Sequence, residues 1–249
     1  MLVCLSGMIR PKPVFFYLMM SLTVMISSSM GVLQYGYSQE APATPSEISV
    51  LSSSSFTEDI GAYHIVGEVK NNSPSDSMKY VKIVATLYGK TGKVIGTDFT
   101  FSDVGVLRPA EKSPFEIILT DIRQSQKVSS YKLSTSGDKT RALPAALKLS
   151  VDNSYRDSIG FYHAAGEVTD QGSQKATYVK VSGTFYNSSG SVVAADFSYT
   201  DPHDLEPGQT APFEMVITSS GSTANKIAYA SVNVGSDQYL SIIQNETSR

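Results

Sequence analysis

The chain of 249 residues is long enough for one or two domains beside a short extra segment. Its composition is that of a globular protein, and a net charge of -3 without clustered Lys or Arg excludes a nucleic-acid partner. The only cysteine is Cys4, so the rest of the chain can form no disulfide, thiolate metal site or cysteine nucleophile. The 14 Tyr and 10 Phe, with no Trp, favour strands over helices.

Residues 1–38 have the layout of a secretory signal peptide. They contain no Asp or Glu, and Arg10 and Lys12 precede an apolar run at residues 14–26. A small-x-small pattern then ends at Ser38, where a signal peptidase would cut. The sequence therefore predicts an exported protein.

A retained membrane anchor is the alternative for the same segment. Residues 13–37 carry no charge and are long enough to span a bilayer, and the basic residues before them would place the remainder outside. Both interpretations predict an extracellular or cell-surface location, with contact to a membrane only through residues 13–37 if they are not removed. Residues 39–45, with two prolines, are expected to be a linker.

An internal repeat of domain length is the strongest feature of the sequence. Residues 62–69 match residues 161–168 at a shift of 99, from His64 to His163, and residues 80–82 match residues 178–180. Further matches follow in the same order: Leu87-Tyr88 with Phe185-Tyr186, Asp98-Phe99 with Asp196-Phe197, Leu107 with Leu205, Pro109 with Pro207, Pro114-Phe115-Glu116 with Pro212-Phe213-Glu214, and Tyr131 with Tyr229. A period near 98 is too long for a solenoid repeat and suits a whole domain.

The repeat divides the chain into two similar domains. We expect the first at residues 46–137 and the second at residues 145–235, with a linker at 138–144 and a polar C-terminal tail at 236–249.

Within each copy, short alternating segments between turn residues indicate an all-β fold. In the first copy Tyr63, Ile65, Gly67 and Val69 are expected to face inward. Two tandem immunoglobulin-like antiparallel β-sandwich domains fit this pattern best.

Both copies resemble the FxLYD domain family. The segments that carry the resemblance are Gly67-Glu68-Val69-Lys70-Asn71-Asn72, residues 81–88, Leu107-Arg108-Pro109 and Pro114-Phe115, with Gly166-Glu167-Val168, Thr184-Phe185-Tyr186 and Leu205-Glu206-Pro207-Gly208 in the second copy. The motif is half kept, because its initial Phe is Ala85 or Gly183 here, and its Asp is Gly89 or Asn187. The resemblance implies a small extracytoplasmic β-sandwich, and it assigns no activity because the family has no motif of catalytic residues to transfer.

Polar and aromatic side chains recur at outward positions of two neighbouring predicted strands in each copy, at residues 63–70 and 80–88 and at the matching residues 162–168 and 178–186. This candidate binding face consists of His64, Glu68, Tyr80, Lys82 and Tyr88 in the first copy, and His163, Glu167, Tyr178, Lys180 and Tyr186 in the second. A half-exposed polar sheet face, or a contact between the two copies, would produce the same repeated residues.

Other sites have weaker support. The outward His64 and His163 favour copper or zinc binding as the alternative function, although no close His pair is present. Asp196, Asp201 and Asp204 lack the spacing of an EF-hand calcium site. No metal ligands and no cofactor are assigned to particular residues. No catalytic residue is predicted either, since the chain has no nucleophile elbow. Glycosylation sequons begin at Asn71, Asn187 and Asn245.

The sequence thus favours a non-catalytic extracytoplasmic binding or structural module of the cell envelope. Its expected partner is another envelope protein, a glycan or a second copy of the same chain. The metal-binding surface protein is the alternative, and a hydrolase is the least favoured hypothesis because domains of this size rarely offer a cleft.

Overall fold

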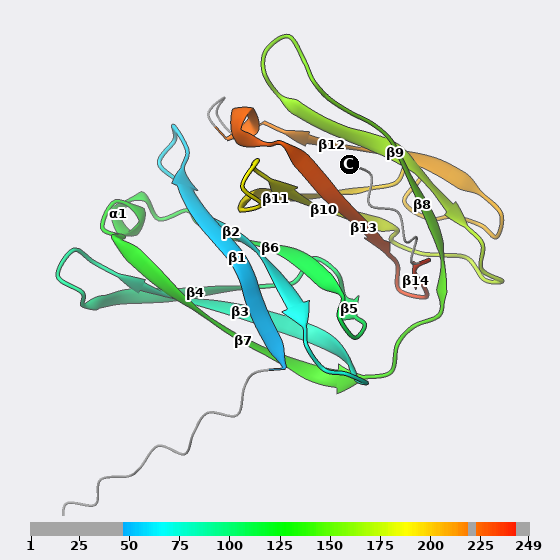
Figure 1. Ribbon diagram of the computed structural model, residues 1–249, viewed down its shortest axis with the longest axis horizontal. Helices are drawn as coiled ribbons and strands as arrows, with labels where there is room; N and C mark the ends of the chain where they lie inside the picture. Colours follow the sequence, from blue (N-terminus) through cyan, green and yellow to red (C-terminus); the bar gives the residue numbers. More distant parts are fainter. Residues whose placement is uncertain (1–46, 219–222, 243–249) are drawn as a thin grey trace, which may run out of the picture. The chain divides into compact units, whose positions relative to one another are not determined.

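A computed structural model describes residues 47–218 and 223–242, and it is all-β (Figure 1). The predicted leader at 1–38 and linker at 39–45 lie outside the described residues. Within the described part, none of the helices is long and apolar enough to cross a membrane. Residues 43–249 belong to one compact unit.

The first repeat forms two sheets. Its elements are β1 (Ile48–Thr57), β2 (Tyr63–Asn71), β3 (Ser77–Tyr88), β4 (Val94–Phe101), β5 (Val106–Leu107), β6 (Lys112–Leu119), the short helix α1 (Ile122–Ser125) and β7 (Ser130–Thr140). One sheet has the order β1-β2-β6, and the other has the order β4-β3-β5 with β7 also paired to β3. Both sheets contribute to one apolar core, whose largest members include Ile65, Ile83, Leu87, Phe115 and Ile117.

The second repeat follows the same course. Its elements are β8 (Ala145–Arg156), β9 (Tyr162–Asp170), β10 (Lys180–Tyr186), β11 (Val192–Tyr199), β12 (Thr210–Ile217), the 3-10 turn η1 (Ala224–Lys226), β13 (Tyr229–Gly235) and β14 (Leu240–Ser241). The strands β8-β9-β12 and β11-β10-β13 correspond to the two sheets of the first repeat, and β14 joins them into one hydrogen-bonded path. A separate core includes Leu147, Phe185, Leu205 and Met215.

Close packing explains why both copies carry the sequence Gly-Glu-Val. Gly67 faces the core as predicted, and a Cβ atom there would lie 2.5 Å from the ring of Phe115. Gly166 has the same neighbour in Phe213, with the carbonyl of Ser150 closer still. Each glycine therefore makes room for the Phe of the Pro-Phe-Glu motif on the adjacent strand.

The structure corrects three details of the expected organisation. Strand β7 continues to Thr140, into the predicted linker at 138–144. The polar tail expected from Ser236 is wrong in its first residues, because Tyr239 and Leu240 are buried. Strand β14 pairs with β8 in parallel, whereas an antiparallel fold was expected throughout. The side chain of Tyr239 packs in the second core and that of Leu240 is buried, and both hold the chain in this position.

Candidate functional site

The outer side of the sheet β1-β2-β6 contacts the second repeat. An apolar cluster at this contact contains Val66, Tyr186, Val192 and Ala195, with Phe56 packed against it. The hydroxyl of Ser54 donates to the carbonyl of Val192 at 2.7 Å, and the amide of Val192 donates to Ser52 Oγ at 3.1 Å. We call this contact between the repeats the seam.

Glu68 is a charged residue buried in the seam, with 3% of its surface exposed. One carboxylate oxygen accepts a hydrogen bond from the hydroxyl of Tyr186, and the other lies 3.1 Å from Nζ of Lys112. Burial, followed by the hydrogen bond to Glu68, raises the pKa of Tyr186, so its hydroxyl remains a donor. The buried carboxylate is therefore satisfied by one group from each repeat.

A partly buried ion pair also crosses the seam, between Lys180 and Asp103, with Nζ and Oδ1 2.6 Å apart. Burial raises the pKa of Asp103, while the charge of Lys180 opposes this effect. Burial also raises the pKa of the neighbouring Asp196 to about 6, with contributions from the charges of Glu116 and Asp103. Lys180 thus lies near two aspartates, Asp103 and Asp196, and both aspartates are close enough to Glu116 to feel its charge.

The two histidines have the same environment in the two repeats. Nδ1 of His64 lies 2.8 Å from Glu116, and its ring stacks on Phe56 with centroids 4.7 Å apart. Nδ1 of His163 lies 2.8 Å from Glu214, and its ring stacks on Tyr155 at 4.6 Å.

Both imidazoles are surrounded by carboxylates. Burial lowers the pKa of His64, but the hydrogen bonds and charges of Glu116 and Glu58 together raise it by more. The pKa of His64 therefore lies above its ordinary value. Hydrogen bonds to Glu214 and Asp157 raise the pKa of His163. Each imidazole stacks on an aromatic ring and forms ion pairs with two carboxylates when it is protonated. Among the described residues, no group of three or more His, Cys, Asp or Glu side chains could hold a metal ion.

The structure divides the predicted binding face into three sets. His64, Glu68 and Tyr186 are buried and Lys180 is engaged across the seam, so the expectation that these four belong to a binding surface is wrong. Of the equivalents on the opposite repeats, Glu167 is exposed, and Lys82, Tyr88 and His163 are half-buried. Tyr80 and Tyr178 form the third set, 65% and 64% exposed. Both tyrosines have a positive φ, of 50° and 52°, which is rare for a bulky side chain.

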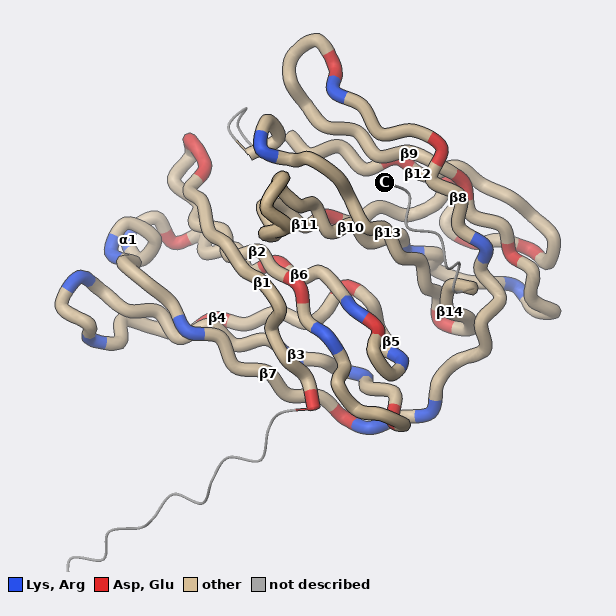
Figure 2. The backbone as a smooth tube through the Cα atoms, viewed as in Figure 1, with Lys and Arg blue, Asp and Glu red and all other residues tan. Residues whose placement is uncertain are grey.

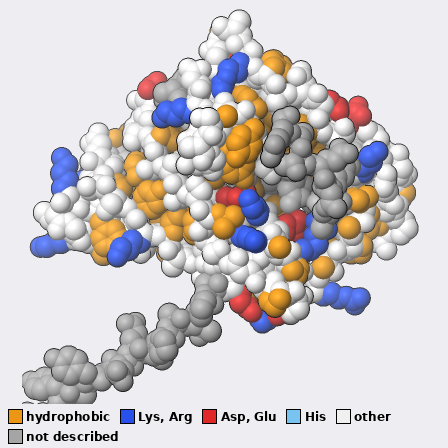
Figure 3. Space-filling model, viewed as in Figure 1, with side chains coloured by type: hydrophobic (Ala, Val, Ile, Leu, Met, Phe, Trp, Pro, Cys, Tyr) orange, Lys and Arg blue, Asp and Glu red, His pale blue; other side chains and the backbone are white. Residues whose placement is uncertain are grey.

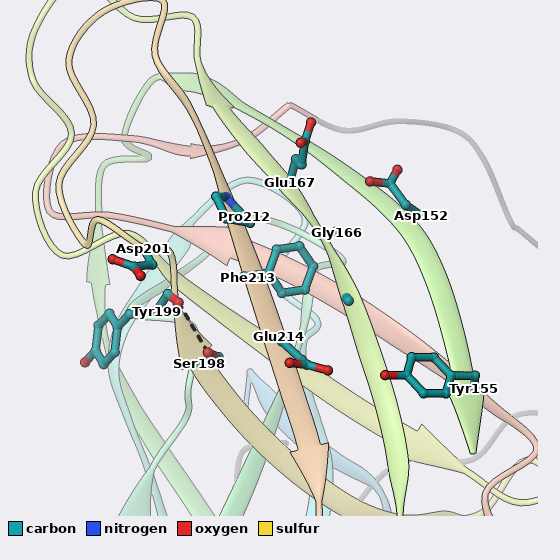
Figure 4. Close-up of a pocket in the computed structure, with 11 residues that line it drawn as sticks. Asp152, Tyr155, Gly166, Glu167, Ser198, Tyr199, Asp201, Pro212, Phe213 and Glu214 are labelled. Atoms are coloured by element: carbon teal, nitrogen blue, oxygen red, sulfur yellow. Dashed lines mark hydrogen bonds between the residues drawn. The ribbon is translucent and has the colours of Figure 1, made fainter. Parts of the chain in front are cut away.

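An open pocket lies on the outer side of β8, β9 and β12 (Figure 4). It has a volume of about 630 Å³ and is lined by Asp152, Tyr155, Ala165, Gly166, Glu167, Ser198, Tyr199, Asp201, Pro212, Phe213 and Glu214. Four of these residues are acidic and none is basic. Acidic positions along β8, β9 and β12 are visible in Figure 2. The pocket is therefore suited to a cationic group accompanied by an apolar or aromatic one.

The outer side of the sheet β4-β3-β7 has the opposite character. Nζ of Lys82 lies 3.9 Å from the ring centroid of Phe99, and Nζ of Lys132 lies 5.8 Å from that of Tyr88. The side chain of Val94 is 58% exposed. Figure 3 shows, on the face that it displays, apolar patches that reach the surface with Lys and Arg side chains at their margins.

Sequence reasoning considered Asp201 as a calcium ligand and did not identify Asp103 and Asp201 as acidic partners for the repeated Lys side chains. Asp103 and Asp201 recur at a shift of 98, and both follow the strand that ends at Phe101 or Tyr199. The amide of each donates to the carbonyl of the proline on the adjacent strand, at 3.0 Å in both repeats. The repeat shift was thus a signal that could have identified them.

The structure also bears on the sequons. Asn71 is fully buried, and its side-chain amide donates to the carbonyls of Asp76 and Leu107. The prediction of glycosylation at Asn71 is therefore wrong for the folded protein, since a glycan needs an accessible side chain. Asn187 lies in the accessible turn before β11 and stays a prediction, and Asn245 lies outside the described residues.

Comparisons with known proteins identify no family. No family model matches the chain, and no curated protein matches it. Among solved structures it is similar to red sea bream transglutaminase, with 9% identity, a TM-score of 0.26, and coverage of 79% of this chain and 30% of that one. It is also similar to Amycolatopsis orientalis exo-chitosanase CsxA, with 12% identity, a TM-score of 0.28, and coverage of 76% and 26%. The chain spans less than a third of these proteins, and at such TM-scores the likeness carries no argument about function.

Proposed function

We propose that this chain is a non-catalytic extracytoplasmic module of the cell envelope, which binds a partner through the surfaces of two immunoglobulin-like sandwiches. The leader-like segment at residues 1–38 supports export, and the repeated pattern that resembles the FxLYD domain supports the same compartment. In this role the chain is secreted, or held by its N-terminal segment at the cell surface.

The observation that carries the proposal is the seam. A buried hydrogen bond from Tyr186 to Glu68 and a partly buried ion pair between Lys180 and Asp103 join the repeats and fix their outer sheet faces in one geometry. The acidic pocket on the second repeat and the basic, aromatic face on the first are both built on strands. Rigid strands hold side chains for recognition more accurately than mobile loops do.

The character of the pocket favours binding over catalysis. Its lining contains carboxylates, Tyr and Ser198, but no lysine, histidine or cysteine that would activate a nucleophile. The pocket is open to solvent, and catalytic electrostatics are strongest where water is excluded. A cationic or hydrogen-bonding group of a partner would fit it better than a reacting substrate.

Cross-linking in intact source cells tests this role. A membrane-impermeant amine cross-linker is expected to label the chain from outside and to join Lys82 or Lys132 to a peptide of a neighbouring envelope protein or of the chain itself. The variant Lys82→Arg keeps the charge but removes the reactive amine, so its cross-link should disappear, whereas Lys90→Arg in a turn should leave it. A chain protected from the reagent inside the cell, or labelled without any cross-link, would overturn the proposal.

A further inference from the structure

The two repeats meet through different faces. The first repeat contributes the outer side of β1-β2-β6, and the second contributes the outer side of β10 and β11. Such a heterologous contact leaves one copy of each face unused within the chain. The unused faces are the outer side of β8-β9-β12, here called the acceptor face, and the outer side of β4-β3-β7, here called the donor face.

The acceptor face is the counterpart of the side that the seam covers in the first repeat. Glu167 pairs with Ser150 and Pro212 across its neighbouring strands, as Glu68 pairs with Ser52 and Pro114. Glu167 is exposed, whereas Glu68 is buried.

Asp201 is a second acidic residue of the acceptor face, and it is equivalent to Asp103 of the seam. Asp201 has the backbone bond to Pro212 that Asp103 has to Pro114. Asp201 and Glu167 line the open pocket, while Asp103 and Glu68 receive Lys180 and Tyr186. In the first repeat, the position equivalent to this pocket is filled by Lys180 and Tyr186 of the second repeat.

The donor face matches as closely. Tyr88 pairs with Val94 at the end of β3, as Tyr186 pairs with Val192 at the end of β10. Lys82 pairs with Phe101 where Lys180 pairs with Tyr199. Lys82 also lies over the ring of Phe99 at the same 3.9 Å as Lys180 over the ring of Phe197. The side chains that enter the seam from the second repeat therefore have accessible copies on the first.

We propose that a second copy of this chain docks its donor face on the acceptor face, and so reproduces the seam between molecules. Tyr88 of one copy then donates to Glu167 of the next, and Lys82 pairs with Asp201. Because the contact is heterologous, association continues from copy to copy unless the rotation closes a ring. The proposal rests on the non-catalytic envelope role proposed above and names the partner as the chain itself.

Charge complementarity supports this occupant. The acceptor pocket carries four carboxylates and no basic side chain, and the donor face presents Lys82 and Lys132 beside aromatic rings. Opposite potentials on two docking faces increase the association rate and disfavour a contact between two like faces. On the acceptor face Tyr155 stacks on His163, as Phe56 stacks on His64 at the equivalent positions beside the seam.

Three differences weaken the contact between copies relative to the seam. Lys112, which pairs with Glu68, is replaced by Thr210, and the apolar Ala195 is replaced by Thr97. The seam also has hydrogen bonds from Arg108 to Ser241, and Glu206 occupies the equivalent position in the second repeat. The contact between copies is therefore reversible and dependent on concentration.

Sedimentation of residues 43–249, which belong to one compact unit, tests the proposal. The mean mass of the wild-type protein is expected to rise beyond a dimer, or to the mass of a closed ring, as its concentration approaches about 1 mM. Lys82→Glu and Asp201→Lys should each raise the dissociation constant at least about tenfold, because each places like charges together. The control variants Lys90→Glu and Asp59→Lys, at exposed turn positions, should associate as the wild type does.

Mixing the variants tests whether position 82 of one copy meets position 201 of the next. Each variant alone places like charges at this contact, whereas every contact between Lys82→Glu and Asp201→Lys places opposite charges together, so an equimolar mixture should associate far more strongly than either variant alone. The double variant with both changes in one chain should associate again, because the charges are opposite once more.

Three outcomes would overturn the proposal: a wild-type protein that stays monomeric, single variants that associate normally, or a mixture that stays monomeric. None of them bears on cross-links to another envelope protein, so the failure of self-association and the failure of the envelope role are distinguishable. Circular dichroism of each variant verifies that the fold is retained.

Discussion

The hydroxyl of Tyr186 donates a hydrogen bond to the carboxylate of Glu68, and this contact joins the two repeats across 118 positions of the chain. Each residue has an equivalent that makes no such contact, since Tyr88 and Glu167 lie on accessible faces of the same chain. The repeat thus contains its own control: the same residue types occur once inside the seam and once outside it.

Replacement of Tyr186 by Phe removes the hydroxyl and leaves the ring in place. A buried carboxylate oxygen of Glu68 then loses its donor, and the free energy of unfolding is expected to fall by about 1–3 kcal/mol. Urea denaturation followed by fluorescence measures the change. The control Tyr88→Phe is expected to change stability by less than about 0.5 kcal/mol because Tyr88 is half-buried and makes no contact with Glu167 within the chain. Equal losses in the two variants would show that the seam bond contributes nothing specific.

Asp196 makes the stability of the seam depend on pH. Its pKa of about 6 in the folded protein lies above the ordinary value of 3.8, so the folded state binds this proton more tightly than the unfolded state. Through this group, stability is lowest above pH 6 and increases as the pH falls through 6 toward 4. Asp196→Asn is therefore expected to stabilise the protein at pH 7.5 and to lose that advantage by pH 4.5.

Thermal unfolding at the two pH values tests this prediction. The matched control is Asp98→Asn, because both aspartates accept a hydrogen bond from the amide of the Phe that follows. Only Asp196 lies near carboxylates of the other repeat. The same pH-dependent gain in both variants would contradict an origin in the seam.

The interior of each repeat was predictable from alternation along the strands. Ile65 and Val69 are buried in the core, as the pattern in β2 predicts, and Gly67 meets the ring of Phe115. Alternation works because successive side chains of a strand point to opposite faces. One match in the repeat was wrong: Tyr131 pairs with Leu87, while Tyr229 pairs with Tyr186 and belongs to the opposite face.

The candidate site was predictable only as a set of residue types. Alternation assigns Glu68 to the outer side of its strand, but it carries no information on what covers that side. In a heterologous contact each position is buried in one repeat and accessible in the other, as Glu68 and Glu167 are. A binding face and an internal contact therefore leave the same repeated residues, and only the tertiary structure separates them.

The exposed tyrosines provide a test of backbone strain. Tyr80 has a φ of 50° at an irregular position of β3. A left-handed conformation costs a non-glycine residue about 1–2 kcal/mol. Tyr80→Gly is therefore expected to be more stable than Tyr80→Ala by about 1 kcal/mol, the reverse of the usual order in a strand. Chemical denaturation of both variants measures the difference, and an alanine variant as stable as the glycine variant would show that no strain is present. Tyr178, with a φ of 52°, should behave in the same way.

Asn71 and Asp170 occupy equivalent buried positions with different hydrogen-bonding capacity. The side-chain amide of Asn71 donates to the carbonyls of Asp76 and Leu107, at 2.8 and 3.0 Å, while its oxygen accepts from the amide of Ser73. In Asp170 one oxygen accepts from the amide of Gly172 at 2.7 Å, and the other, Oδ2, has no hydrogen-bond partner among the described residues.

An amide donor at Asp170 would restore the arrangement of the first repeat. Asp170→Asn is therefore expected to raise the free energy of unfolding by about 1–3 kcal/mol, and the reciprocal Asn71→Asp to lower it by a similar amount. Denaturant titrations at neutral pH measure both changes, with Asn72→Asp on the exposed side of the same turn as the control. If Asp170→Asn destabilises the protein, then the carboxyl group has a partner of its own, and the equivalence of the two buried positions does not extend to their hydrogen bonds.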